Sequence, residues 1–126
     1  MEILPNQRKF TRVPIGYRVK VMSEEITISC ASAINISING ILVEASEPLL
    51  RGTSCSVIIF VLEEGLEIKI MALGTVVRNN ANGLAIRFSK ILGKDGREQL
   101  QNLIMFRCND PEQAKQEFED FVRQTA

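Results

Sequence analysis

Two arginines near the N-terminus carry the first side chains in this sequence that are suited to binding an anion. Arg8 and Arg12 enclose three residues, and Pro14 follows shortly after them. Because Pro14 biases the residue before it toward extended geometry, we expect a loop here rather than a helix. A guanidinium group donates two parallel hydrogen bonds to a phosphate or to the O6/N7 edge of a guanine. Taken alone, the pair also fits a solvated basic tail.

A second segment, Asn35 to Gly40, combines polar and apolar residues in alternation. In extended geometry Asn35 and Ser37 point to one side, while Ile36 and Ile38 point to the other, toward a core. Gly40 permits either a positive φ or the close approach of a ligand to the backbone. The same residue types also favour an ordinary turn at the entrance to a strand. Alone, this segment therefore leaves binding and turn formation both open.

The residue types that most enzymes need are scarce. Histidine is absent, which removes the commonest general base and the commonest metal ligand. The three cysteines, Cys30, Cys55 and Cys108, are far apart and lack CxxC spacing, which argues against a disulfide framework and a zinc site. We expect Cys30 and Cys55 to be small buried apolar residues. The sequence thus predicts no enzyme activity, no metal site and no cofactor.

Charge is balanced overall but unevenly distributed. The 15 basic and 15 acidic residues cancel, yet residues 1–20 carry five basic residues against Glu2 alone. A basic N-terminal segment in a neutral chain suits a small anionic ligand better than DNA or RNA, which would need a wide basic face. We therefore expect no nucleic-acid partner.

The length of 126 residues suits one domain with one core. The longest apolar run, Val57 to Leu62, is too short to cross a bilayer and suits a buried strand. Pro5 to Arg8 interrupts any signal-peptide pattern. These features predict a soluble cytoplasmic protein without membrane insertion.

Alternating apolar residues and turn signals predict six antiparallel strands with no helix between them. Such a run folds as a closed or nearly closed six-stranded antiparallel β-barrel, so the fold class is mainly β. Gly74 is expected to mark a bend or a bulge in the long fifth strand. The predicted strands are Tyr17–Val21, Ile26–Cys30, Gly40–Ala45, Ser54–Leu62, Leu66–Arg78 and Gly83–Phe88.

The remainder of the chain is predicted to be helical. Leu100, Leu103 and Ile104 form a stripe suited to packing on the barrel. Asp110 is a good N-cap, with Pro111 at the first helical position. A second stripe is expected to pack on the protein's own barrel, with homodimerisation as the alternative; it consists of Ala114, Phe118, Phe121 and Val122.

The expected organisation is therefore a single domain over residues 1–126. It comprises an N-terminal arm (1–14), the barrel (15–93) and the C-terminal helices (94–126).

Taken together and in this order, the two segments resemble the signature of the PilZ domain family, RxxxR followed by [D/N]xSxxG. Arg8 and Arg12 match the first motif. Asn35, Ser37 and Gly40 match the second, with Asn35 in place of the commoner aspartate. The resemblance extends from about Gln7 to the first helix. It includes Ile41–Glu44, Pro48–Gly52, Gly74–Arg78 and Gly83–Phe88. The family fold is a six-stranded antiparallel barrel followed by a helix.

The resemblance implies that the chain binds cyclic di-GMP, a ring with two phosphates and two guanines. By position, Arg8 and Arg12 would grip phosphate and the guanine Hoogsteen edge from a flexible loop. Asn35 and Ser37 would hydrogen-bond the ligand, and Gly40 would keep the turn compact. The arginine loop would wrap over the nucleotide, rearrange the arm and pass the signal to a protein partner.

Three features bear on how such a receptor would work. Gln7 stands where an additional arginine tends to accompany a stacked pair of ligands, which favours one ligand. Asn35 cannot accept charge-assisted bonds as a carboxylate would, which favours lower affinity. Met1 to Gln7 is a short arm, which leaves little chain to transmit a signal. The alternative reading is a degenerate PilZ-type adaptor that binds protein and no nucleotide.

Overall fold

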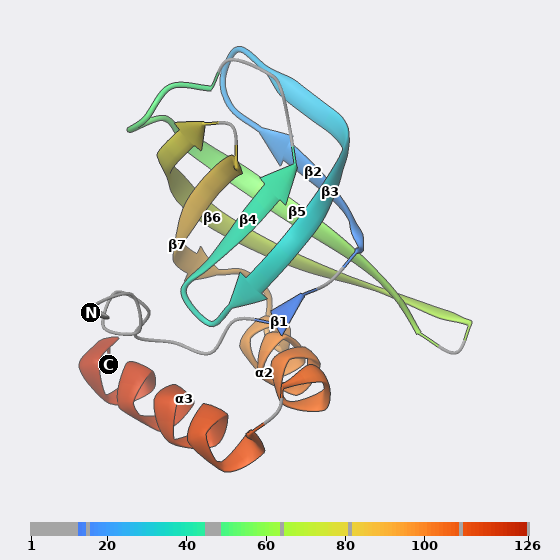
Figure 1. Ribbon diagram of the computed structural model, residues 1–126, viewed down its shortest axis with the longest axis vertical. Coiled ribbons are helices and arrows are strands. Elements are labelled where there is room, and N and C mark those ends of the chain that lie inside the picture. Colours follow the sequence, from blue (N-terminus) through green and yellow to red (C-terminus); the bar gives the residue numbers. More distant parts are fainter. Residues whose placement is uncertain are drawn as a thin grey trace.

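A computed structural model describes residues 13–14, 16–44, 49–63, 65–80, 82–108 and 110–125 of the chain. It contains a curved β-sheet followed by two helices (Figure 1). The strands are β1 (Val13–Pro14), β2 (Arg18–Met22), β3 (Thr27–Ser37), β4 (Gly40–Glu44), β5 (Ser54–Glu63), β6 (Leu66–Asn80) and β7 (Gly83–Ile91), and the helices are α2 (Gly96–Arg107) and α3 (Pro111–Thr125).

The sheet closes on itself, as the sequence predicted. Its strand order is β1-β3-β2-β5-β6-β7-β4, and an additional pairing between β3 and β4 joins the two sides. Strands β2 to β7 therefore form a closed six-stranded antiparallel barrel, with β1 added alongside β3. Closure pairs the strand edges with each other along most of their length.

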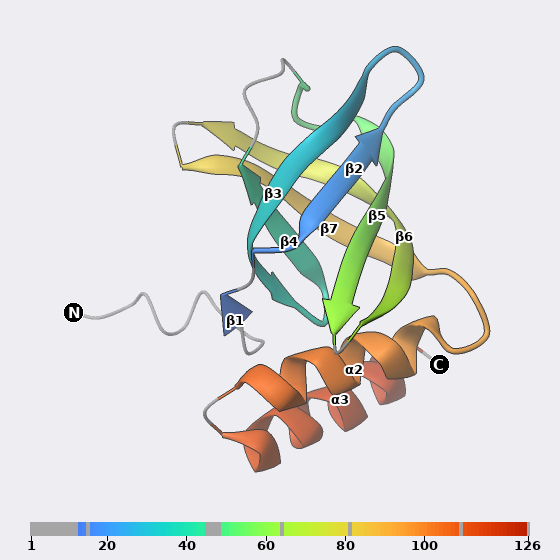
Figure 2. The same ribbon diagram turned by 90° about the vertical axis from the view of Figure 1, so that its right-hand side faces the viewer.

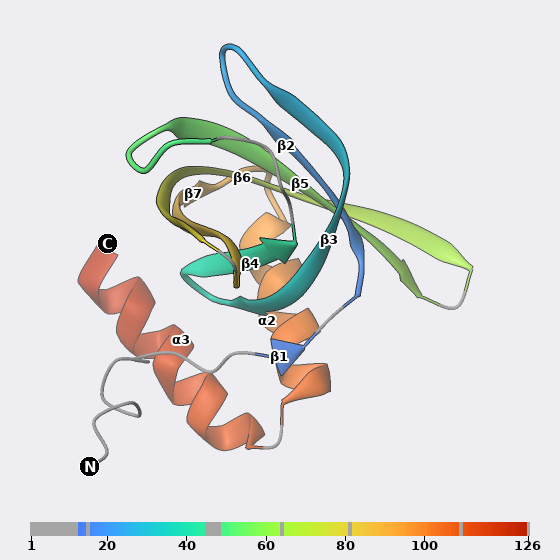
Figure 3. The ribbon, with the colours of Figure 1, turned by 45° about the horizontal axis from the view of Figure 1, so that its top comes forward.

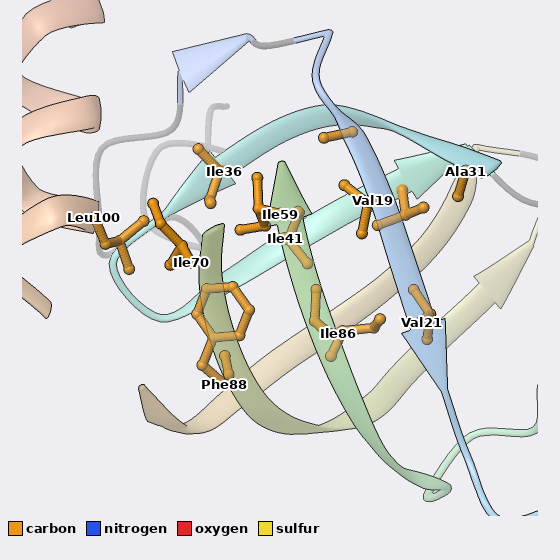
Figure 4. Close-up of a cluster of buried hydrophobic side chains, with 14 of the residues drawn as sticks. Val19, Val21, Ala31, Ile36, Ile41, Ile59, Ile70, Ile86, Phe88 and Leu100 are labelled. Carbon is orange, nitrogen blue, oxygen red and sulfur yellow. The ribbon is translucent and has the colours of Figure 1, made fainter. Parts of the chain in front are cut away.

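The barrel interior is filled by apolar side chains from all six barrel strands, most of them β-branched (Figure 4). Strand residues of one parity point inward, so each strand contributes alternate positions to one core. Fully buried examples include Val19, Ile36 and Ile59. Leu100, 0% exposed, reaches this core from α2 and lies beside Ile70 at one end of the barrel.

The second barrel strand is longer than predicted. We expected it to end at Cys30, but β3 continues to Ser37. Its register shifts twice, once against β2 and once against β4 between Ala33 and Asn35. These bulges break the period-two alternation, so the second half of β3 does not read as a strand in the sequence. Asn35 and Ser37 thus lie at the end of β3 rather than at the entrance to β4.

Gly74 lies at an irregularity of β6 of the bulge kind, which bends a strand, in agreement with the predicted bend or bulge. The register with β7 shifts between Leu73 and Gly74. A Cβ atom at Gly74 would lie 2.5 Å from the carbonyl oxygen of Arg87, so the two strands approach too closely there for any side chain. The bend allows the long β6 strand to curl around the barrel.

The β5–β6 hairpin projects beyond the other strands (Figures 1 and 3). Strand β2 pairs with β5 only as far as Phe60, and β7 pairs with β6 only from Ala72 onward. We call residues 61–63 and 65–70 the hairpin tip.

The two helices form layers at one end of the barrel (Figure 2). The predicted stripe of α2 is buried, with Leu100 and Ile104 both 0% exposed. The backbone N–H of Gln113 donates to Asp110 Oδ1 at 3.1 Å, which confirms the predicted N-cap of α3.

The second helix differs from the prediction in its packing partner. Ala114 and Phe118 are buried, but α3 makes its main contacts with α2 rather than with the barrel. The side chains of Phe121 and Val122 lie outside the described part of the structure. Amphipathicity indicates that a helix buries one face but does not specify against which element.

Cys55 is buried, as predicted, and burial raises the pKa of its thiol above the ordinary value because the thiolate would lose its hydration. Among the described residues, no helix has both the length and the apolar composition needed to cross a bilayer.

Candidate functional site

The turn that joins β3 to β4 is organised by the hydroxyl group of Ser37. Ser37 Oγ donates to Asn39 Oδ1 at 2.8 Å and accepts from the backbone N–H of Asn39 at 3.3 Å. The side chain is 2% exposed, the one buried polar residue among the described ones. A serine hydroxyl has two acceptor lone pairs, so one remains beyond the bond from Asn39. The sequence reasoning missed this role, because it depends on the side-chain conformation of Asn39.

The residues on either side of Ser37 point into the core, as predicted. Ile36 is 0% exposed and Ile38 is 1% exposed. These two side chains anchor the turn from within, while the carbonyl of Asn39 accepts from the N–H of Phe88 at 2.8 Å. The turn is therefore fixed both to the core and to β7.

Gly40 is required because β7 passes close by, not because of a positive φ. A Cβ atom at this position would lie 2.7 Å from the carbonyl oxygen of Ile86 and 3.5 Å from the Cα of Arg87. The sequence suggested close approach of a ligand, whereas in the structure the close neighbour is a strand. The glycine of the second motif thus allows β4 and β7 to pair at the start of β4.

Asn35 lies where the N-terminal segment joins the barrel. Strand β1 pairs with β3, with Val13 opposite Ile36 and Pro14 opposite Asn35. Asn35 is partly exposed. The β3–β4 turn and β1 lie near each other at the helical end of the barrel in both side views (Figures 1 and 2).

The structure therefore brings together three of the five predicted site residues, Asn35, Ser37 and Gly40, in one hairpin. Arg8 and Arg12 lie outside the described residues. In the sequence, Arg12 directly precedes Val13, which pairs with Ile36.

The register extends the outer face of this hairpin onto two further strands. Ser37 pairs with Gly40, Gly40 with Arg87, and Arg87 with Thr75 on β6. Directly opposite residues share a face of the sheet. Arg87 is exposed, and its neighbours on the adjacent strands are the smaller residues Gly40 and Thr75. Its guanidinium therefore projects from the same face as the motif. The sequence reasoning missed it, although the alternation of Ile86, Arg87 and Phe88 indicates an outward arginine.

A parallel row runs beside the first. Asn35 pairs with Leu42, Leu42 with Ala85, and Ala85 with Arg78. This second row carries a polar amide at one end, apolar side chains in the middle and an exposed arginine at the other end. Together the two rows place the half-buried Leu42 and the exposed Arg78 and Arg87 on one outer face with the second motif, and arginine groups suit an anion. No group of three or more metal-ligating side chains is found in the described ranges.

Comparison with known proteins identifies a family and a fold. The sequence profile of the PilZ domain matches residues 6–106. Among solved structures, MotI/DgrA, the inhibitor of motility of Bacillus subtilis, superposes with a TM-score of 0.65 at 24% identity, over 79% of this chain. This chain spans half of that protein, 50% of its length.

A second structure has a more limited likeness. The PilZ domain of CeSA from a cellulose-synthesizing bacterium superposes with a TM-score of 0.52 at 19% identity, over 76% of this chain and 96% of that domain. Both structural likenesses concern the barrel fold. A search of curated proteins returned no match.

Proposed function

The chain belongs to the PilZ domain family, a family of cyclic di-GMP receptors, and from this premise we propose that it is itself a receptor for cyclic di-GMP. The ligand would bind on the outer face beside the β3–β4 turn. Arg8 and Arg12 would reach it from the N-terminal arm, and Asn35 from the barrel. Ser37 and Gly40 would give the turn its shape, with Ser37 offering its remaining lone pair to a donor.

The observation that carries this proposal is the pairing of β1 with the end of β3. Strand β1 begins one residue after Arg12, and it pairs with the end of β3 that carries the second motif. In the proposed site, two motifs that are 23 residues apart from Arg12 to Asn35 would therefore lie at one end of the barrel. Convergence of two guanidinium groups and an amide suits a ligand with phosphates and guanine edges.

The direct test is calorimetric titration with cyclic di-GMP. We expect the wild-type protein to bind, and Arg8→Ala or Arg12→Ala to weaken binding by at least about tenfold, because each removes a charge-assisted contact. Arg51→Ala is the matched control, since Arg51 is exposed and lies outside both motifs. Equal affinity in all four proteins would contradict the assignment of the arginines.

We further propose that the arm changes its conformation to cover the ligand and passes the signal to a protein partner. Trypsin cleaves after arginine and lysine, so the arm has sites at Arg8, Lys9 and Arg12. Saturating cyclic di-GMP should slow cleavage at these sites severalfold and leave cleavage at Lys94 unchanged. An unchanged ratio of the two cleavage rates would argue against wrapping.

The second candidate function is an adaptor that binds protein and no nucleotide. The exposed Phe106 and Leu66 favour it, at 80% and 68% exposure, since large exposed apolar side chains mark interaction surfaces. The wild-type titration separates the two functions, because an adaptor of this kind gives no heat with cyclic di-GMP.

A further inference from the structure

The outer edge of β6 is unpaired along the hairpin tip. Within the described ranges, no strand pairs with this edge between Leu66 and Ile70, because β7 pairs with β6 only from Ala72 onward. Unpaired strand edges present N–H and C=O groups that another strand can bind. The tip projects away from the barrel, so this edge is reachable (Figure 3).

The backbone groups that face this edge belong to Glu67 and Lys69. The carbonyl of Met71 accepts from the N–H of Leu92 at 2.8 Å, on the side where β7 lies. Along an antiparallel strand, alternate residues direct their backbone groups to the same side. The register of β6 against β5 is unshifted from Thr75 to Leu66, so Lys69 and Glu67 face the same way as Met71.

We propose that a second copy of this chain pairs with this edge, the two Leu66–Ile70 segments running antiparallel about a two-fold axis at Ile68. This register places Glu67 of each copy opposite Lys69 of the other. Both residues direct their backbone groups to the edge, so the pair can exchange hydrogen bonds. The proposal concerns a surface distinct from the nucleotide site and is independent of nucleotide binding.

Charge favours this register over the two registers in which the axis is shifted by one residue. Shifting the axis to Glu67 or to Lys69 would place like charges directly opposite each other, which destabilises a strand pair. With the axis at Ile68, symmetry instead gives two Glu67–Lys69 pairs, one on each side. Both side chains are exposed in the single chain, so neither charge has lost its hydration before the two copies pair.

The face of the hairpin tip that carries Leu66 and Ile68 is also suited to contact with a second copy. It forms, with α2, an apolar cavity of about 330 Å³ lined by Val61, Ile68, Leu103 and Phe106 among others. Residues directly opposite across a strand pair share a face, so the partner's Leu66 and Ile68 would project on the side of this cavity. Five residues from each chain make a short contact, so we expect weak, concentration-dependent association.

The decisive experiment reverses the charges of Glu67 and Lys69, singly and together, in the 126-residue chain. Sedimentation velocity over a concentration series should show a monomer–dimer equilibrium for the wild type. Glu67→Lys and Lys69→Glu should each weaken the dimer by about tenfold at low salt, since symmetry doubles each change. The double variant Glu67→Lys/Lys69→Glu should restore it. The matched control, Lys90→Glu on β7, should leave the equilibrium unchanged.

Two results would overturn the proposal. One is a wild-type protein that stays monomeric at every concentration. The other is a double variant that associates no better than the single ones, which would leave general charge effects as the cause. Circular dichroism checks that each variant is folded, and the substituted positions are exposed.

Crosslinking tests the register itself. Opposite residues in a non-hydrogen-bonded pair have Cα atoms about 4.5 Å apart, which a disulfide can span. Ile68→Cys should therefore give a covalent dimer on mild oxidation, above the baseline of the parent protein and its own cysteines. Leu62→Cys, exposed on the other strand of the tip, should not. Equal crosslinking of both variants, or of neither, would contradict the two-fold axis at Ile68.

Discussion

Ser37 shows how one side chain can shape a binding site from beneath it. Its hydroxyl is hydrogen-bonded to both the side chain and the backbone of Asn39, and it is almost fully buried. A buried hydroxyl that satisfies its neighbours stabilises a turn more than an exposed one does. The serine of the second motif therefore has a structural reason to be present whether or not it contacts ligand.

Replacing Ser37 by alanine tests this role. Ser37→Ala leaves Asn39 without the partner of its side chain and its N–H, so we expect a loss of about 1–2 kcal/mol in the free energy of unfolding. Urea denaturation measures it. The control is Ser54→Ala at an exposed position of β5, which should change stability by less than about 0.5 kcal/mol. Equal stability of the two variants would show that the Ser37 bonds contribute nothing.

Asn35 departs from the commoner aspartate of the family motif. Its amide can donate as well as accept, but it cannot supply the charge-assisted acceptor that a carboxylate would. Arg87 and Arg78 on the same outer face add positive charge that the two motifs do not include. In the proposed site, the cationic groups would therefore contribute most of the attraction for a doubly charged ligand.

At the scale of elements, β4 and β7 approach each other closely at the start of β4. Gly40 allows this contact, since a Cβ atom would lie 2.7 Å from a backbone oxygen that cannot rotate away. The two strands are neighbours in the closed barrel but are far apart in sequence. A side chain at this position would have to separate them.

Gly40→Ala should therefore lower the free energy of unfolding by about 1–3 kcal/mol, as expected for overpacking. Thermal or chemical denaturation gives the value. Gly16→Ala is the control, because nothing lies within 4 Å of a Cβ atom there. If both variants were as stable as the wild type, the close approach of β7 would not be what requires glycine at position 40.

Most of the barrel could be predicted because five of its six strands keep period-two alternation or clear turn signals. The second half of β3 could not, since two register shifts move its inward positions out of phase. The packing of α3 on α2 also escaped prediction, because an apolar stripe does not identify its partner. For the site, the residue types indicated the location, but the hydrogen bonds of Ser37 depend on the side-chain conformation of Asn39. The alternation around Arg87 indicates that it points outward, but only the strand register places it beside the motif.

At the scale of the whole molecule, one end of the barrel carries both the motif turn and the helices. The turn lies near β1 and the helical end (Figures 1 and 2). Residues of the hairpin tip and of α2 line the apolar cavity together. The likeness to MotI covers 79% of this chain and 50% of that protein, and what it shows is a shared fold. A change in the arm at β1 would therefore take place close to α2, with which β1 is in contact.

The central claim is that cyclic di-GMP binds on the outer face beside the β3–β4 turn. Amide chemical shifts in two-dimensional NMR, followed during titration with cyclic di-GMP, test it most directly. We predict saturable shifts at Asn35, Asn39, Gly40 and Arg87, with the amides of the hairpin tip unchanged. GMP at the same concentration is the control for weak nonspecific binding. The absence of shifts at the turn, or shifts confined to another face of the barrel, would contradict the account.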